Sequence, residues 1–470
     1  MQTVLTSLRN QALADYYRCP DGIGDFVLTG ELADVSGFFR FGPEVICYGK
    51  SSSPVSAQAA GAELHDSLQE VSTEDSVLRL PFDPTQIIDN LRCERYVMNT
   101  PHATTIPVLK SLIRSCYYAV RPLLPVPIRR HIQRFYFRGW SEIPFPNWPV
   151  DRTVESLMET LLLVSLKANG VQEVPFIWFW PQGSPSCTIV THDVEALPGR
   201  NFCTKLMDID DSAGIKSSFQ IVPEERYPAP ESFLNEIRQR GFEVNVHDLK
   251  HDGLLYSERE RFLQHVQQIN QYGKEFRAVG FRSGALYRNL DWYDALDFSY
   301  DLSVPNVGHL EAQQGGCCTV MPFFVGKILE LPLTTTQDYS LFQILRNYSI
   351  DLWKKQVGLI LEKHGLISFI IHPDYIIEKR ARNTYQCLLE YIAQIRSDGM
   401  TWVALPREVS DWWRQRSQMK LVRDNGAWRI EGPGKERARI AYAAVNGDKI
   451  SYEIGYTGRP LPGCSQASRR

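Results

Sequence analysis

The chain has 470 residues, of which 43% are hydrophobic and 22% charged, and its formal net charge is −3. This composition is typical of a soluble globular protein, and the length predicts two to four domains. The near-neutral charge gives no reason to expect a nucleic-acid partner. No apolar run reaches the ~18–20 residues that a transmembrane helix needs.

The first residues lack the basic region, long apolar core and small-residue cleavage site of a signal peptide. The ten cysteines form no CxxC pair, which favours reduced thiols over a disulfide framework. Both observations predict a cytoplasmic location.

Residues 1–106 carry short alternating segments with Gly and Pro turns, and predict a β-rich or α+β accessory domain. Residues 107–150 form a connector in which arginines alternate with aromatic residues. Such a segment could lie on an anionic membrane surface or meet a lipid-linked glycan. Pro122, Pro125 and Pro127 interrupt a long amphipathic helix and favour a helical connector that packs on the next domain.

Residues 151–417 alternate strand-like and helix-like segments of the length found in βα units. We therefore predict an α/β fold with a parallel sheet that closes as a deformed (β/α) barrel. Residues 418–470 change to hairpin character, with an Asn446-Gly447-Asp448 turn between alternating runs. They predict a small C-terminal β module that packs on the barrel or binds a ligand.

Polar residues follow the strand-like segments of the barrel region. The run CTIVTHDVE ends in Asp193 and Glu195, before Pro198-Gly199 interrupts the chain. The carboxyl ends of strands are where α/β proteins place their chemistry.

His247 and His251 lie at the end of another strand-like segment, GFEVNVHDLKHDG. Their spacing of four would point both imidazoles the same way in a helical turn, as a tetrahedral Zn²⁺ site requires. Arg282 ends AVGFRSG, and His372 ends LISFIIHP. Such convergence at one barrel face indicates an active site.

The motifs THDVE, HDLKH, FRSG and IIHP, in this order, resemble those of the NodB-homology polysaccharide deacetylases, carbohydrate esterase family 4. The resemblance covers about 180–416 and is closest to a branch with HDVE in the first motif. NWPVDRTVESL and ELPLTTTQDYSLF also resemble segments of that branch. The family implies a deformed barrel that removes an N-acetyl group from an amino sugar of a glycan or glycan precursor, with a divalent metal, expected to be Zn²⁺.

The resemblance implies a role for each residue. Asp193 matches the catalytic base and Arg282 the arginine that orients it, while His372 matches the general acid. Glu195, His247 and His251 would bind the metal.

Three positions depart from the family pattern. Val194 occupies the position of the usual metal-binding carboxylate, which moves that role to Glu195. Asp248 and Gly284 replace the usual residues of the second and third motifs, and 298–306 matches the fourth only loosely. Two alternatives stay open: a hydrolase of small amides or formamides, and a degenerate glycan-binding protein.

Overall fold

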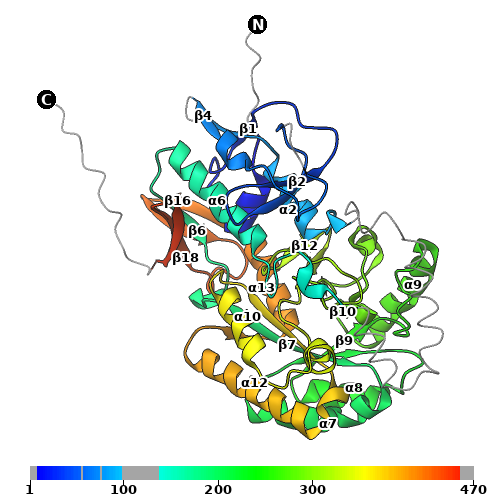
Figure 1. Cartoon of the computed structure of the whole chain (residues 1–470). Coiled ribbons are helices and arrows are strands. Elements are labelled where there is room, and N and C mark those ends of the chain that lie inside the picture. Colours follow the sequence, from blue (N-terminus) through cyan, green and yellow to red (C-terminus); the bar gives the residue numbers. More distant parts are fainter. Residues whose placement is uncertain (1–7, 54–56, 75–76, 98–136, 456–470) are drawn as a thin grey trace, which may run out of the picture.

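The computed structural model describes residues 8–53, 57–74, 77–97 and 137–455 (Figure 1). Most of the predicted connector, residues 107–136, lies outside these ranges, so its two interpretations stay open. Among the described helices, none is long and apolar enough to cross a membrane. The eight cysteines in these ranges are free thiols, as predicted.

The largest sheet has nine strands in the order β12-β13-β11-β10-β9-β8-β7-β14, and β15 pairs with the first two residues of β7. All neighbours are parallel except β12 and β13. The strands are β7 (Cys187–Val194), β8 (Ser218–Ile221), β9 (Glu243–His247), β10 (Gly280–Arg282), β11 (Tyr300–Asp301), β12 (Phe323–Val325), β13 (Ile328–Glu330), β14 (Leu366–Ile371) and β15 (Trp402–Val403). This parallel order confirms the predicted (β/α) barrel.

Helices surround this sheet (Figure 1). They are α7 (Leu197–Ser212), α8 (Glu231–Gln239), α9 (Arg259–Glu275), α10 (Asp351–Leu361), α11 (Pro373–Ile376), α12 (Lys379–Ser397) and α13 (Pro406–Gln418). The short helices η6 (Gly284–Leu286), η7 (Leu290–Ala295) and η8 (Ser340–Ile344) lie in the connecting loops. Pro198 and Gly199 were expected to interrupt the chain, but they fall in the first turn of α7. Proline is tolerated there because the first turn has no partner for its N–H.

The barrel is completed by side chains where its two edges meet. Thr334 Oγ1 donates to the Leu366 carbonyl at 2.7 Å and accepts from the Ser368 N–H at 2.9 Å. Thr335 Oγ1 donates to the Ser368 carbonyl at 2.7 Å. Threonine hydroxyls thus take the place of a strand ladder on this side of β14.

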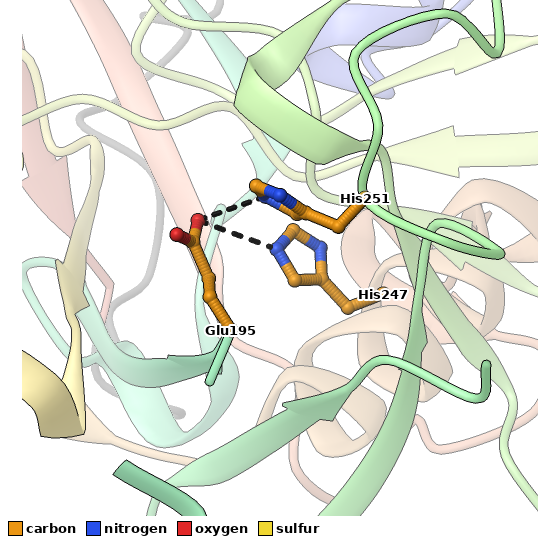
Figure 2. Close-up of side chains that lie close together, drawn as sticks. All are labelled: Glu195, His247 and His251. Atoms are coloured by element: carbon orange, nitrogen blue, oxygen red, sulfur yellow. Dashed lines mark ion pairs between the residues drawn. The ribbon is translucent and has the colours of Figure 1, made fainter. Parts of the chain in front are cut away.

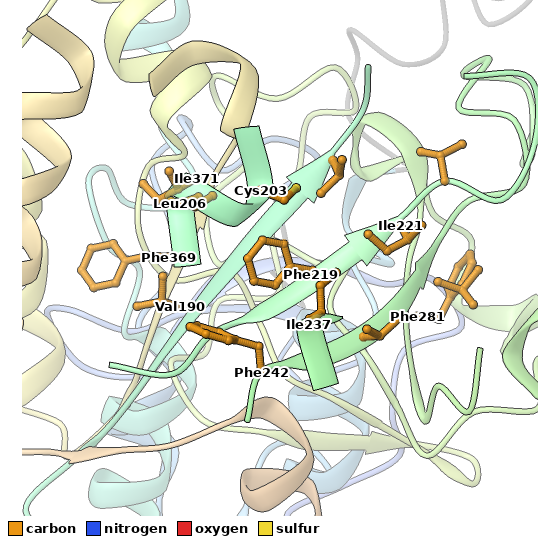
Figure 3. Close-up of a cluster of buried hydrophobic side chains, with 14 of the residues drawn as sticks. Val190, Cys203, Leu206, Phe219, Ile221, Ile237, Phe242, Phe281, Phe369 and Ile371 are labelled. Atoms are coloured by element: carbon orange, nitrogen blue, oxygen red, sulfur yellow. The ribbon is translucent and has the colours of Figure 1, made fainter. Parts of the chain in front are cut away.

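The barrel strands alternate between an apolar outer face and a polar inner face. Figure 3 shows part of the outer core, with Val190, Phe219 and Phe369 of three strands beside Leu206 of α7 and Ile237 of α8. Successive strand residues point to opposite faces, so the residues between these apolar ones face the interior. They are buried and mostly polar: Thr191, Asp193, Ser218, Gln220, Asn245, His247, Arg282, Ser368 and His372.

The N-terminal residues form an α+β module. Its strands pair in the order β1-β5-β4, and β2 pairs with β3. The elements are α1 (Gln11–Tyr17), β1 (Phe26–Leu28), β2 (Gly37–Arg40), β3 (Ile46–Gly49), η1 (Ser67–Glu70), β4 (Ser72–Glu74), β5 (Val77–Leu80) and α2 (Pro84–Arg92). Its apolar side chains join one continuous core with the amino-terminal end of the barrel.

The C-terminal residues form two hairpins, β16 with β17 and the predicted one, β18 with β19. The turn at 446–449 confirms the Asn-Gly signal. β18 also pairs with β6, which precedes the barrel, so this module packs on the rest of the chain. The elements are α6 (Thr153–Ala168), β6 (Glu173–Ile177), β16 (Lys420–Asp424), β17 (Ala427–Glu431), β18 (Ile440–Asn446) and β19 (Lys449–Ile454), with η4 (Trp140–Glu142) and η5 (Pro181–Gly183) between modules.

A buried carboxyl group joins α6 to the barrel. Glu155 is fully buried and accepts hydrogen bonds from Thr319 Oγ1 and, at 3.2 Å, from the Val320 N–H. Burial raises the pKa of Glu155 to about 7, although the Thr319 hydroxyl opposes the shift. The folded protein therefore favours the neutral carboxyl.

We expect Glu155→Gln to gain stability relative to the wild type as the pH rises. In the unfolded chain the Glu155 carboxyl ionises near 4.5. The neutral carboxyl therefore stabilises the folded wild type fully below that pH, and this contribution is lost as the pH rises through about 7. Urea denaturation at pH 5 and pH 8.5 measures the change, with the exposed Glu173→Gln as the control. An equal difference from wild type at both pH values would contradict this expectation.

Candidate active site

The strand tips bring the six predicted site residues together at the carboxyl end of the barrel. Asp193 is on β7, and Glu195 is the first residue after that strand. His247 ends β9, Arg282 ends β10 and His372 directly follows β14. Contacts of 2.5–3.9 Å join these side chains in one cluster.

Glu195, His247 and His251 present three potential metal ligands to one another. Glu195 Oε1 lies 2.8 Å from His251 Nε2 and 3.9 Å from His247 Nε2 (Figure 2). All three ligand atoms lie within 4.8 Å of one another. In tetrahedral zinc sites, bonds of about 2.0–2.1 Å place neighbouring ligand atoms roughly 3.3–3.4 Å apart. The spacing of this triad therefore suits a small divalent metal.

The histidines converge for a different reason from the one expected. They do not share a helical turn: His247 ends a strand, and His251 lies in the following loop. Asp248 and His251 both adopt left-handed backbone, with φ of 58° and 53°. This compact loop turns the second imidazole back toward the first.

Two buried ring nitrogens support the fit of a metal. Nε2 of His247 and Nε2 of His251 are buried and face Glu195 Oε1, but neither makes a hydrogen bond of acceptable geometry with any described residue. Nδ1 of His247 lies 3.1 Å from the Arg282 carbonyl, which can only accept, so the ring proton is on Nδ1. The Nε2 lone pair of His247 then faces the other two members of the triad. Metal-binding histidines are commonly held in this way, with a carbonyl at the other ring nitrogen.

Arg226 contacts the outer edge of His251. Its Nη2 donates to the His251 carbonyl at 2.6 Å and lies 3.2 Å from Nδ1. A metal at Nε2 requires the ring proton on Nδ1, so the guanidinium would then bond to the carbonyl alone.

Asp193 is fixed by a buried arginine. Arg282 Nη1 donates to Asp193 Oδ1 at 2.5 Å and to Thr191 Oγ1 at 2.8 Å, and its Nε donates to the Leu302 carbonyl at 3.0 Å. The other carboxylate oxygen, Oδ2, faces His247 Nε2 at 3.8 Å. One oxygen of Asp193 is thus held while the other faces the triad.

His372 is oriented by Asp338, a residue that the sequence motifs did not assign. Asp338 Oδ1 lies 2.6 Å from His372 Nδ1, and its Oδ2 accepts from the His372 N–H at 2.8 Å. The other ring nitrogen, Nε2, lies 3.4 Å from Glu195 Oε1. Asp338 falls in the segment ELPLTTTQDYSLF, whose similarity to the family was visible in the sequence, but no periodic pattern marked this acid as a partner of His372.

The opposite charges in the cluster favour the ionised forms of one another's side chains. Burial would raise the pKa of Glu195, but His251 above all, with His247 and His372, holds it well below 4.5. Burial likewise opposes ionisation of Asp193, and Arg282 and His247 lower its pKa. Burial lowers the pKa of His372, yet Asp338 and Glu195 raise it well above 6.5.

The departures from the family pattern have local explanations. Val194 belongs to the outer core, so strand alternation turns Glu195, and not Val194, toward the interior. Asp248 contacts the loop after β10: its Oδ2 accepts from the Gly284 N–H at 3.2 Å. A Cβ on Gly284 would lie 2.3 Å from that oxygen, so the close approach requires glycine.

His192 of the HDVE motif is not part of the cluster. Its Nε2 lies 2.8 Å from Asp210 Oδ2 on α7, and its Nδ1 lies 3.2 Å from the Ile371 carbonyl of β14. Tyr385 on α12 donates to the other oxygen of Asp210 at 2.6 Å. This histidine anchors β7 to its neighbours from the outer face.

No family model and no curated protein matches the sequence. Among solved structures, a protein described as a polysaccharide deacetylase of Mycobacterium smegmatis is 18% identical, with a TM-score of 0.41, over 51% of this chain and 93% of that one. An allantoinase is 13% identical, with a TM-score of 0.40, over 50% and 92%. Peptidoglycan deacetylase PdaC from Bacillus subtilis is 12% identical, with a TM-score of 0.32, over 49% and 93%.

Polysaccharide deacetylases are thus among the solved structures to which this chain is similar.

We expect His247→Ala and His251→Ala each to lose a bound divalent metal. Each change removes one of three ligands, and Glu195→Ala should act in the same way. Metal content after dialysis against a weak chelator measures the loss, with His265→Ala on α9 as the matched control. Wild-type stoichiometry of Zn²⁺ in the variants would contradict the ligand set.

Proposed function

We propose that this chain is a metal-dependent hydrolase that removes an N-acetyl or related N-acyl group from an amino sugar. The observation that carries the proposal is the convergence of three parts on one point. These parts are the triad of Glu195, His247 and His251, the Asp193–Arg282 pair, and the His372–Asp338 pair.

The amino-sugar substrate rests on the resemblance of the four motifs, and the hydrolytic chemistry rests on the geometry. Amide hydrolysis requires a base for the attacking water and an acid for the leaving amine. The cluster supplies a candidate for each, with Asp193 3.8 Å from His247 and His372 3.4 Å from Glu195. A degenerate site is disfavoured because Glu195 faces both histidines at 2.8 and 3.9 Å.

The triad would hold the metal, which we expect to be Zn²⁺. When bound, such an ion polarises an amide carbonyl and lowers the pKa of water. His247 keeps its ring proton on Nδ1 through the Arg282 carbonyl, and so offers Nε2 as a ligand.

Asp193 would accept the proton of the attacking water through Oδ2. Arg282 bonds to Oδ1 at 2.5 Å, which fixes the plane of the carboxylate and leaves Oδ2 directed at the triad. Because the guanidinium is fully buried, water does not compete with Asp193 for its hydrogen bond.

His372 would donate a proton to the amine that leaves. Asp338 accepts from Nδ1, so the proton transferred is the one on Nε2, which points toward Glu195. An amine is a poor leaving group as an anion, so this transfer is needed for the C–N bond to break.

The test is acetate release by purified, metal-loaded protein from N-acetylated sugars, nucleotide sugars and lipid-linked glycans, with formamides and small cyclic amides as the competing substrate class. Release from a sugar supports the proposal. Turnover of the small amides alone would instead favour the small-molecule hydrolase. Absence of turnover with stoichiometric metal on every class would contradict the proposal.

We expect Asp193→Asn to lower kcat by a factor on the order of 10²–10⁴, because the amide cannot accept the proton. The metal should stay bound, since Asp193 is not one of the three ligands. Steady-state kinetics together with metal content measure this, with the exposed Asp208→Asn on α7 as the control. Wild-type turnover in Asp193→Asn would exclude it as the base.

A further inference from the structure

The loop that follows Arg282 borders the candidate active site. The Gly284 N–H donates to Asp248, between the two metal-site histidines, and a Cβ on Gly284 would lie 3.1 Å from the His251 ring. Leu286 packs in the interior against Leu333 and Ile370, two residues before His372. Residues 283–288, here called the site loop, therefore touch the surroundings of both the metal ligands and the acid.

The site loop holds an unfavourable backbone conformation. Ala285 and Leu286 both have left-handed φ, 53° and 54°. Consecutive non-glycine residues in this region persist only where neighbouring contacts enforce them. The loop must therefore be held from outside its own sequence.

Arg288 is the side chain that holds it. Its Nη1 donates to the Leu286 carbonyl at 2.8 Å. Its backbone is paired with Gln313 through two hydrogen bonds of 3.0 and 3.1 Å. Arg288 itself is buried, with 4% of its surface exposed, so its charge requires a partner.

That partner comes from the N-terminal module. Glu94 lies just after α2, and its Oε2 accepts a hydrogen bond from Arg288 Nε at 2.6 Å. Its Oε1 forms an ion pair with Arg288 Nη2. The Gly316 N–H also donates to Oε1 at 2.5 Å, and the Tyr96 hydroxyl donates to the Gly316 carbonyl at 2.6 Å.

Two backbone features fit this contact. Glu94 has a left-handed φ of 56°, in a position where glycine or asparagine would cost less strain. A Cβ on Gly315 would lie 2.6 Å from Glu94 Oε1, so the loop at 315–316 approaches the carboxylate as only glycine can. The contact is therefore accommodated from both sides.

We infer that Glu94 is a positioning residue for the reaction, and that the N-terminal module completes the active site through the buried Glu94–Arg288 pair. The pair fixes the carbonyl of Leu286 and hence the left-handed turn of the site loop. Arg282 is held independently, by the strand ladder with His247 and by its own hydrogen bonds. Loss of the pair should therefore displace the site loop and leave the metal ligands in place.

The inference rests on the proposed hydrolysis, so the test combines a kinetic readout with one that needs no substrate. The variants are Glu94→Gln and the double variant Glu94→Leu with Arg288→Met, which leaves no unpaired buried charge. Glu44→Gln, an exposed glutamate of the same module, is the control. Each metal-loaded protein is measured for kcat, KM, metal content, and amide hydrogen exchange over 283–289 and 313–317.

In both variants we expect kcat to fall on the order of tenfold or more, with KM and metal content nearly unchanged, because the loop is misplaced while the ligands remain. Exchange should accelerate in the two loop segments and not in β7 or β9. If Glu94→Gln does not fold, the double variant decides.

Wild-type kcat and wild-type exchange in the folded double variant would overturn the inference. So would a loss of activity matched by an equal loss of folded protein, since that would be a role in stability alone. A wild-type protein that releases no acyl group would contradict the proposed function, and the exchange rates would then decide the positioning by themselves.

Discussion

The buried guanidinium of Arg282 is the charge around which the interior of the barrel is arranged. It sits at the tip of β10, fully buried, and a cation in that position must be matched by acceptors. Thr191 and Asp193 of β7 and the Leu302 carbonyl after β11 provide them. The same residue's carbonyl sets the tautomer of His247. One arginine thereby ties together three strand tips, the candidate base and a candidate metal ligand.

Strand alternation separates the two tasks of this sheet. Outward residues such as Val190 and Val194 build the apolar core against the helices, and inward residues such as Asp193 carry polar chemistry. A carboxylate at 195 reaches the histidines because it is two residues from Asp193, on the same face. A carboxylate at position 194, immediately after Asp193, would point toward the apolar core in the same regular strand. The shifted motif is thus compatible with a strand that keeps its regular pleat through Val194.

The sequence was most informative where a polar residue ends a strand. The parallel barrel and the convergence of the six candidate residues could be predicted because apolar runs and their polar tips are local signals. The predicted helical turn between His247 and His251 was wrong, since left-handed loop residues bring them together. Asp338 and Glu94 escaped assignment because their roles are defined by contacts with residues 34 and 194 positions away. No periodicity in either neighbourhood encodes such a partner.

The pairing of β6 with β18 joins residues near 175 to residues near 442. β6 has no other partner in its described sheet, so it stays an open edge until the residues of β18 have been synthesised. The aromatic residues that follow it, Trp178 to Trp180, belong to the same buried core as β18. During synthesis the finished barrel must therefore wait with an unpaired strand and exposed aromatic surface, features that favour aggregation and chaperone binding. Deletion of β18 and β19 should accordingly affect yield from cells before it affects chemistry.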